Sequence, residues 1–322
     1  MSEPLVSVVM PTYNHAGFIQ EAVDSVLNQS YRNLELIIVD NYSEDKTADI
    51  IGSYKDQRIK YLKFRNNGII AASRNYGIQQ AVGKYVAFID SDDVWLSAKL
   101  TLQVTALETG GGPRGISFCK FKVISPDTAD HEKIMGPKGS ILPERLYERL
   151  IKANFIVSSS TVVLKQALDD VGWFDEHPDL RCSEDFDLWL RIARKYKAAY
   201  VDEVAGIYRM HGSNQSANDL RLRRALAVID KHFQKGWINQ HLADKARASF
   251  YFQVGWTLIG EDSRLARSHC TKALYYDFTN PRIILVSMLG VGLSYIPGAY
   301  RILRKNKLDK KIARRTINPQ NL

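Results

Sequence analysis

The sequence predicts an α/β protein with a mostly parallel central sheet, helices on the faces of the sheet and a C-terminal helical extension. Three observations predict this fold class. Short β-branched runs alternate with helical stretches from residue 5 to about residue 83. Polar residues follow several of these runs, and the pattern is helical from residue 219 to about residue 280. Alternating strands and helices favour parallel strands joined by right-handed crossovers.

The predicted elements follow in chain order. Runs typical of strands occupy residues 5–10, 34–39, 58–63, 84–89, 115–121 and 155–164. Helical spacing is found in residues 17–29, 46–54, 70–82 and 184–195, and a further helix begins near Trp95. Residues 125–139 contain Pro, Gly and Asp and predict a mobile loop. In sheets of this kind, ligands bind beyond the carboxyl ends of the strands.

The chain divides into three predicted regions: an α/β domain over residues 1–216, a helical region over 217–281 and a tail over 282–322. Residues 248–281 have about the length of one tetratricopeptide repeat. Residues placed much as in that repeat are Gly255, Leu258, Gly260, Ala266, Ala273, Asn280 and Pro281. The alternative is a helical appendage with small residues at its packing positions.

The positive charge is concentrated in the tail. The chain has 44 Lys and Arg against 35 Asp and Glu, a net charge of +9. Residues 282–322 contain nine of the basic residues and a single acid, Asp309, so +8 of the net charge lies there. A nucleic-acid enzyme is expected to spread basic side chains over its working face. The neutral body therefore predicts no nucleic-acid partner.

Cysteine usage and the N-terminus indicate a reducing compartment. The three cysteines are far apart and lack any C-x-x-C pairing, so neither a disulfide framework nor a zinc site is predicted. The first residues have no basic segment, and the apolar run between Pro4 and Pro11 is too short for a signal peptide. We expect the chain in the cytoplasm.

The tail suggests contact with a membrane. Residues 283–300 are uncharged, and Arg301, Arg304, Lys305 and Lys307 follow directly. Eighteen residues is the lower limit for a spanning helix, and Gly and Pro interrupt this run. An interfacial or re-entrant segment is favoured, with a spanning helix and a packed core helix as alternatives. The prediction is peripheral contact with the cytoplasmic face of the cell membrane.

Polar residues follow three of the predicted strands and form a candidate site. Any one of these loops alone is ordinary turn chemistry. If the strands are parallel neighbours, however, the loops converge at one edge of the sheet, and this joint placement is informative. The loops are Pro11, Thr12, Tyr13 and Asn14; Asp40, Asn41, Tyr42 and Ser43; and Asp90, Ser91, Asp92 and Asp93.

The Asp-x-Asp loop is suited to a divalent cation. Carboxylate oxygens bind Mg²⁺ or Mn²⁺ and leave coordination positions for substrate phosphates. No P-loop or G-x-G-x-x-G turn is present, so a bound diphosphate would depend on metal. Arg74, near the start of its helix, could add a fixed positive charge, or it could be an ordinary surface arginine.

An ordered set of motifs carries a resemblance. The set consists of VSVVMPTYN, LELIIVDNYSEDKT, NNGIIAASRNYGIQQAVGKYVAFIDSDD, GWFDE, SEDFDLWLR and YRMHGSNQS. In order and spacing it resembles family 2 glycosyltransferases with the GT-A fold, of the bacterial cell-surface polysaccharide type, over residues 5–216. One departure is visible: the family usually has glycine after the second strand where this chain has Tyr42.

The resemblance implies roles for several residues. Thr12 and Tyr13 would line the nucleobase pocket, Asp40 would hydrogen-bond the base, and Arg74 would help to hold the nucleotide. The metal ligands would be Asp90 and Asp92, with Asp92 the direct ligand. The predicted nucleotide-binding set is completed by Pro11, Asn14, Asp90 and Ser91.

The resemblance places the catalytic base at Asp185. Glu184 and Asp187 are its neighbours, and all three could merely complement the positive end of a helix that starts near Ser183. His211 could bind the metal or the diphosphate, or it could be a surface residue.

Together these observations predict an inverting, metal-dependent glycosyltransferase. It would use Mn²⁺ or Mg²⁺ and move a hexose-like sugar from a nucleotide-diphosphate sugar, a UDP-sugar, to a hydroxyl of a lipid-linked or surface-polysaccharide acceptor. A catalytically silent nucleotide-sugar-binding protein or membrane scaffold is the alternative. A nucleotidyltransferase is disfavoured because no loop rich in glycine and lysine is present.

Overall fold

The computed structural model contains two compact units, residues 1–216 and 217–322, and each is described by itself. The structure describes residues 3–109, 112, 114–124, 133–137, 139, 141–211, 218–258 and 262–293. The tail beyond residue 293 and residues 125–132 of the predicted mobile loop lie outside these ranges.

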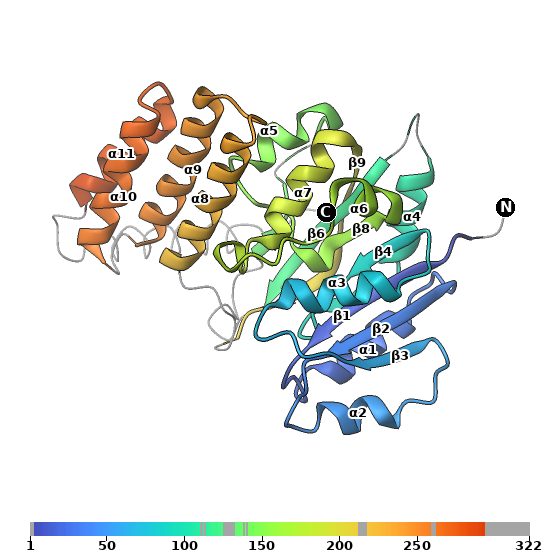
Figure 1. The fold of residues 1–322 in the computed structure, drawn as a ribbon. Helices are drawn as coiled ribbons and strands as arrows, with labels where there is room; N and C mark the ends of the chain where they lie inside the picture. The colour runs from blue at the N-terminus through green and yellow to red at the C-terminus, as the bar shows by residue number, and fades with distance from the viewer. Residues whose placement is uncertain are drawn as a thin grey trace, which may run out of the picture. The chain divides into compact units, whose positions relative to one another are not determined.

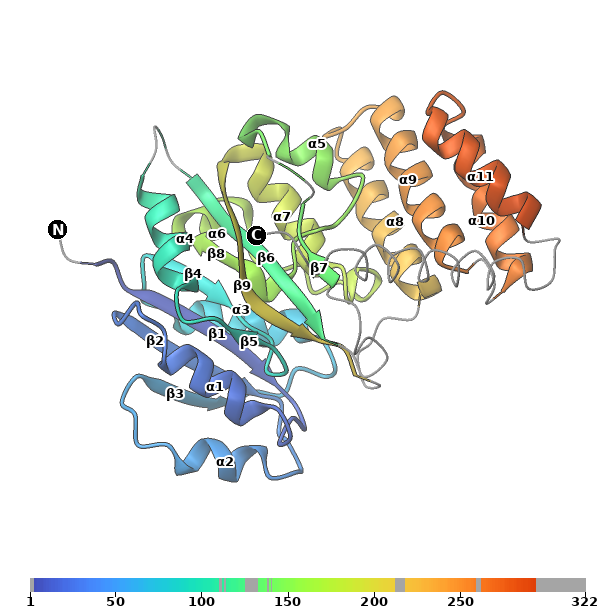
Figure 2. The same cartoon turned by 180° about the vertical axis from the view of Figure 1, so that it is seen from behind.

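The first unit is built on one sheet of nine strands (Figures 1 and 2). The strand order is β3-β2-β1-β4-β8-β6-β9-β5, with β7 paired to β6. The strands are β1 (Val6–Thr12), β2 (Leu34–Asp40), β3 (Ile59–Lys63), β4 (Tyr85–Phe88), β5 (Val94–Trp95), β6 (Arg114–Ile124), β7 (Lys133–Met135), β8 (Thr161–Leu164) and β9 (Lys197–Arg209).

The sheet is mixed, but most of its strands point the same way. β1 pairs in parallel with β2 and β4, and β2 pairs in parallel with β3. β8 is antiparallel to both β4 and β6, so β6 and its parallel neighbour β9 share the direction of β4. Six of the nine strands thus run in one direction, which confirms the predicted mostly parallel sheet.

Helices cover both faces of the sheet. Alternate residues of β1 point to opposite faces: Val8 packs in the core with residues of α1 and α4, whereas Val9 lies against α3, where only glycine fits at position 77. Figure 1 shows α3 in front of the sheet, and Figure 2 shows α1 in front of it. The helices are α1 (Ile19–Leu27), α2 (Thr47–Ser53), α3 (Ile70–Gln80), α4 (Lys99–Glu108), α5 (Leu146–Leu150), α6 (Lys165–Val171) and α7 (Glu184–Lys195).

Several elements differ from the prediction. Strand β7 pairs with β6 inside the predicted loop over residues 125–139, and the helix expected near Trp95 begins at Lys99, after the short strand β5. Helices α5 and α6 were not predicted. Of the strand predicted at residues 155–164, only β8 forms, because Ser158–Ser160 form a 3₁₀ turn in which the Ser160 hydroxyl donates to the Val157 carbonyl. The 13-residue strand β9 was not predicted. Its burial does not alternate regularly, and its pairing with β6 contains register shifts, so no period-2 pattern marks it in the sequence.

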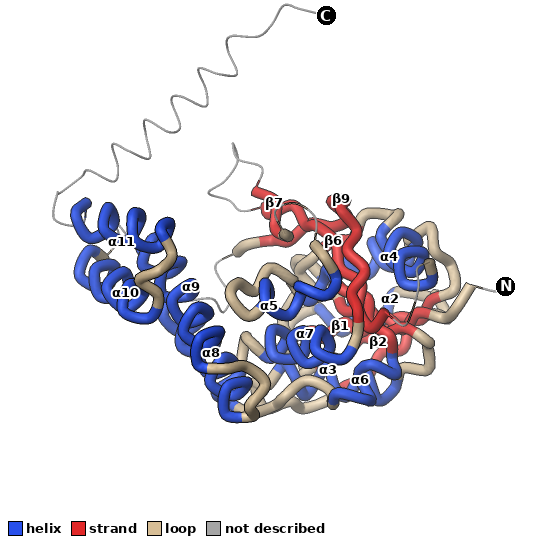
Figure 3. Tube along the Cα trace, turned by 90° about the horizontal axis from the view of Figure 1, so that it is seen from above, coloured by secondary structure: helices blue, strands red, loops and turns tan. Residues whose placement is uncertain are grey.

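The second unit is helical, as predicted, and consists over its described residues of α8 (Asn218–Gln234), α9 (Gln240–Leu258), α10 (Ser263–Tyr276) and α11 (Pro281–Leu293). Successive helices pack side by side (Figure 3). Ala248, Ala273 and Ile283 form a buried cluster that joins α9, α10 and α11. The tetratricopeptide-like assignment of residues 248–281 stays a prediction.

Helix α11 covers the first part of the apolar run at residues 283–300. Ile283 and Ser287 are buried, whereas Leu285 and Met288 on the same helix are each 62% exposed. This part of the run is therefore a helix that packs by one face. Within the described ranges, no helix has both the length and the apolar character needed to cross a membrane.

Candidate active site

The loops after β1 and β2 are joined by hydrogen bonds at one edge of the sheet. Thr12 and Asp40, the last residues of the two strands, are register partners. Asn41 N–H donates to the Thr12 carbonyl over 3.0 Å, and Asn14 N–H donates to Ser43 Oγ over 2.9 Å. The predicted convergence of these loops is therefore present in the structure.

The residues predicted to bind the nucleotide differ in how accessible they are. Thr12 is buried, and its Oγ1 has no hydrogen-bond partner among the residues that the structure describes, while Tyr13 beside it is 48% exposed. Pro11 is buried within β1. Asp40 is fully buried and accepts hydrogen bonds from Ser43 and from the Tyr61 hydroxyl. Both carboxylate oxygens of Asp40 already accept hydrogen bonds, so a nucleobase bonded to Asp40 would share an oxygen with Ser43 or with Tyr61.

Tyr42 adopts the left-handed backbone conformation that glycine, the usual residue of the family at this position, adopts readily. Its φ is 57°, in the left-handed region that favours glycine, and its side chain is 45% exposed. Ser43 N–H and Oγ both bond to Asp40 Oδ1, and this holds the loop in place. The substitution therefore adds an aromatic ring at the sheet edge without opening the turn.

The Asp90–Asp93 loop meets two histidines from distant parts of the chain. Asp92 Oδ2 lies 2.8 Å from His211 Nε2, and Ser91 Oγ lies 2.7 Å from His15 Nδ1. The His211 ring stacks on Phe18 with ring centroids 4.7 Å apart. The structure thus brings the predicted metal ligands Asp92 and His211 together and adds His15, which the sequence did not single out.

Asp93 has a structural role in the same loop. It is buried and accepts hydrogen bonds from Ser159 Oγ and from Arg209 N–H. Burial, followed by the nearby charges of Asp90 and Asp92, raises the pKa of Asp93 well above its ordinary value. Because both oxygens of Asp93 face the protein, Asp90 and Asp92 remain the carboxylates available to a ligand.

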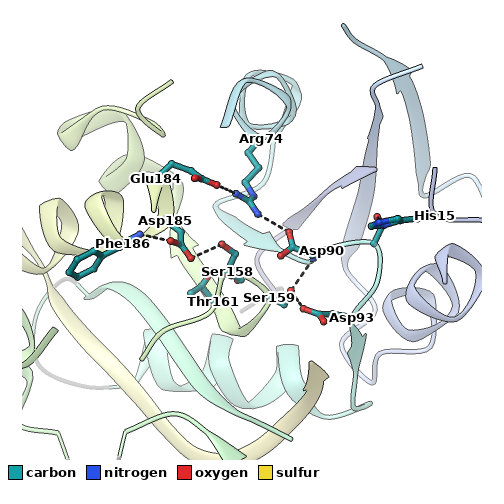
Figure 4. A network of polar contacts seen from close by, with 11 residues as sticks. His15, Arg74, Asp90, Asp93, Ser158, Ser159, Thr161, Glu184, Asp185 and Phe186 are labelled. Atoms are coloured by element: carbon teal, nitrogen blue, oxygen red, sulfur yellow. Dashed lines mark hydrogen bonds and ion pairs between the residues drawn. The ribbon is translucent and has the colours of Figure 1, made fainter. Parts of the chain in front are cut away.

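Arg74 links the Asp90 loop to the start of α7 (Figure 4). Its guanidinium bonds to Glu184 Oε1 at 2.6 Å and to Asp90 Oδ1 at 2.8 Å, and its side chain is 4% exposed. Burial alone would lower the pKa of Arg74, but the carboxylates of Asp90 and Glu184 outweigh burial and raise it. Arg74 is therefore a buried, permanently charged connector and not a surface arginine.

The three acids of α7 have different environments. Glu184 pairs with Arg74, and Asp187 is fully buried and bonds to Arg191 Nε at 2.8 Å. Arg191 in turn donates to the carbonyls of residues 171, 172 and 173, so this pair fastens α7 to the end of α6. Among the described residues, Asp185 alone of the three acids has no cationic partner within ion-pair distance.

Asp185 has the chemistry of a general base. Its Oδ2 accepts a 3.3 Å hydrogen bond from Ser158, and its Oδ1 accepts one from the Phe186 N–H. Burial, and then the charge of Glu184, raises the pKa of Asp185 to about 7 against the opposing charge of Arg74. In Figure 4, Asp185 and His15 lie on opposite sides of Asp90. A carboxyl with this pKa can accept a proton near neutral pH.

The cation-binding groups form a pair and not a cluster. No group of three His, Cys, Asp or Glu side chains in the described ranges is arranged to hold a metal ion. Asp92 and His211 supply a carboxylate oxygen and an imidazole nitrogen, and Asp90 Oδ1 is occupied by Arg74. A cation here would need further ligands from a substrate, as is common for Mg²⁺ and its analogues.

Comparison with known proteins identifies the fold and the relatives of the chain. The family model for glycosyl transferase family 2 matches residues 7–172. Two Escherichia coli relatives carry the name UDP-Glc:alpha-D-GlcNAc-diphosphoundecaprenol beta-1,3-glucosyltransferase. WfaP is 31% identical, covering 67% of this chain and 82% of the relative, and WfgD is 29% identical, covering 81% and 95%.

A solved structure shares the fold. It is the mannosyltransferase PcManGT from Pyrobaculum calidifontis, in complex with GDP-Man and Mn²⁺. The TM-score is 0.57 at 17% sequence identity, and the match covers 93% of this chain and 83% of that one. At this identity the likeness concerns the fold alone, and it confirms the predicted GT-A class.

Proposed function

Because the chain belongs to glycosyl transferase family 2, we propose that it is an inverting, metal-dependent enzyme that moves a sugar from a UDP-sugar to a hydroxyl of a lipid-linked saccharide acceptor. Family membership confirms the predicted transferase class. The proposal is carried by the position of Asp185, a carboxylate without a cationic partner among the described residues. In Figure 4 Asp185 lies on the opposite side of Asp90 from His15, which directly follows the predicted nucleotide-binding residue Asn14.

Asp185 would act as the general base. The acceptor oxygen must lose its proton as it attacks the anomeric carbon, and Asp185 would accept that proton. Ser158 and the Phe186 N–H fix the orientation of the carboxylate. A single base on the face opposite the leaving group gives one direct displacement, and a direct displacement inverts the anomeric configuration.

Asp92 and His211 would hold a Mn²⁺ or Mg²⁺ ion together with oxygens of the donor diphosphate. Asp92 Oδ2 and His211 Nε2 lie 2.8 Å apart, so a carboxylate oxygen, which suits Mn²⁺, and an imidazole nitrogen, a common metal ligand, are already side by side. When bound, the cation neutralises the charge that develops on the departing diphosphate. The solved complex of PcManGT with GDP-Man and Mn²⁺ supports a metal in this fold.

The nucleotide would lie over the loops after β1 and β2. The unpartnered Thr12 Oγ1 offers a hydrogen bond, and Tyr13 offers an exposed ring. Asp40 would approach the base as the family resemblance implies, and Pro11, Asn14 and Ser91 would shape the surface around it. The burial of Arg74 supports a positioning role, in which it holds Asp90 and Glu184 in place.

The acceptor class is supported by the relatives and by helix α11. The two E. coli relatives are named for a diphosphoundecaprenol-linked acceptor. Leu285 and Met288 are exposed on α11, and the chain that follows contains the basic residues of the tail. We propose peripheral attachment at the cytoplasmic face of the membrane, with the tail held by apolar and electrostatic contacts.

The experiment that tests this function is an assay of product formation. The full-length chain is incubated with UDP-sugars and an undecaprenyl-diphosphate-linked N-acetylglucosamine acceptor, with Mn²⁺ or with a chelator, and the product is analysed by NMR. We expect a product with inverted anomeric configuration that forms only with the metal. A retained configuration, or turnover that persists with chelator, would contradict the proposal.

Membrane attachment is tested separately by sedimentation with anionic vesicles. A chain ending at Leu293 keeps α11, whose Ile283 belongs to the core of the helical unit, and removes most of the basic tail. We expect this variant to keep donor binding and to lose part of the vesicle binding at low salt. Salt should weaken binding of the full-length chain, because it screens the basic residues. If both chains sediment equally, the tail does not contribute to membrane attachment.

A further inference from the structure

Residues with left-handed backbone gather at the nucleotide edge of the sheet. Four described residues other than glycine have positive φ, and three of them follow β1, β2 and β3: Asn14, Tyr42 and Asn67. Asparagine tolerates this region because its short side chain can bond locally. Tyrosine gains nothing from it, so Tyr42 is the strained member of the group.

The turn itself does not require tyrosine. Glycine adopts a φ of 57° without steric cost, and the hydrogen bonds that hold the loop come from Asp40, Asn41 and Ser43, not from the ring of Tyr42. Core packing does not explain the ring either, because it is 45% exposed. Backbone strain that the surroundings maintain is characteristic of functional sites.

The ring lies under positive charge. The Arg65 guanidinium lies 4.8 Å from the centre of the Tyr42 ring, and Lys63 Nζ lies 6.0 Å from it. Both residues belong to the end of β3 and the loop that follows it. A ring covered by a guanidinium is a rigid, flat and partly polar surface of the kind on which nucleobases stack.

The strand order places the Tyr42 ring at the distance from the Asp90 loop that a nucleobase would have from its diphosphate. The Asp90 loop follows β4, and β1 lies between β4 and β2. Two strand spacings amount to about 10 Å, which is the reach of a nucleoside from its phosphates. Thr12, whose buried Oγ1 has no partner among the described residues, ends the intervening strand β1, and the exposed Tyr13 follows it.

We propose that Tyr42, backed by Arg65, stacks on the nucleobase of the donor and is a nucleotide-binding residue of this chain. This inference rests on the proposed function, which places the diphosphate at the Asp90 loop. The strain at Tyr42 is then offset by base stacking that glycine could not provide. In this proposal Tyr42 contributes to donor binding and takes no part in the chemical step.

The test compares Tyr42→Gly with Asn67→Gly, a matched control in the next left-handed loop. Binding of UDP, GDP and inorganic diphosphate is titrated in the presence of Mn²⁺, and thermal unfolding of each full-length variant is recorded. For Tyr42→Gly we expect about tenfold weaker binding of the preferred nucleotide, unchanged binding of inorganic diphosphate and a raised melting temperature. Asn67→Gly should leave all three affinities unchanged.

Two results would overturn the inference while leaving the proposed function standing. In one, Tyr42→Gly binds the nucleotide as tightly as the wild-type chain. In the other, nucleotide and inorganic diphosphate weaken equally, which means that the residue acts through the loop and not on the base. If the wild-type chain binds neither nucleotide, both the proposed donor site and this inference fail.

Discussion

The two flanks of the Asp90–Asp93 loop are built in different ways. On the β1 and β2 flank, backbone amides join the turns, and Tyr13 and Tyr42 remain nearly half exposed. On the α7 flank, charged side chains pair with one another in the interior, as Arg74 does with Glu184. The first flank offers surface to a ligand, whereas the second fixes charges before any ligand arrives.

This difference predicts that donor binding and the chemical step can be separated by substitution. Asp185 differs from Glu184 and Asp187 on the same helix because the other two are paired with Arg74 and Arg191. Removal of a group on the α7 flank should therefore affect turnover or stability, and removal of a group on the nucleotide side should affect donor affinity. The following predictions separate these effects.

The largest expected effect is that of Asp185→Asn. An amide cannot take the proton from the hydroxyl of the sugar acceptor. Turnover should therefore fall on the order of 10²- to 10⁴-fold, while donor affinity stays near the wild-type value. Steady-state kinetics and donor titration measure the two quantities. Asp179→Asn, the same change at an exposed carboxylate, is the control and should change neither. A collapse of donor affinity in Asp185→Asn would make Asp185 a binding residue.

Arg191→Met should be the most destabilising change on the α7 flank. It removes the buried ion pair with Asp187 and the hydrogen bonds to three backbone carbonyls. We expect the free energy of unfolding to fall by about 3–5 kcal/mol, measured by urea denaturation. Donor affinity of the folded variant should persist. A loss of donor binding at wild-type stability would show that the two flanks are not separable.

Asp92→Asn should act on the metal. An amide is a poorer, uncharged ligand for a hard cation, so activation by Mn²⁺ should weaken on the order of 100-fold, and binding of the donor diphosphate should weaken with it. A Mn²⁺ titration of donor binding measures the effect. An unchanged titration would remove Asp92 from the site.

The smallest expected effect is that of pH on the wild-type enzyme. Burial raises the pKa of Asp185 to about 7, and a general base is active only when deprotonated. Turnover should therefore fall about tenfold per pH unit below 7 and level off above it. A profile that stays flat down to pH 5 would contradict the assignment of Asp185 as the base.

Much of the fold followed from local patterns in the sequence. Strands β1, β2 and β4 are short, largely apolar runs, and β3 combines apolar residues with lysines. The stretches between them show helical spacing, so the parallel half of the sheet was predictable. Strand β9 was missed because its burial depends on β5 and β6, which lie far from it in the chain. The same reason explains His15 and Ser159, whose roles arise from contacts with the Asp90 loop.

The sequence by itself determined the family, the strand–helix order and the candidate groups, because these reside in residue types and short spacings. Only the tertiary structure decided which acid of α7 has no cationic partner among the described residues, that Arg74 is buried between two carboxylates, and that Asp92 meets His211. Burial and charge pairing depend on residues that are distant in the chain, and for this reason no local pattern specifies them.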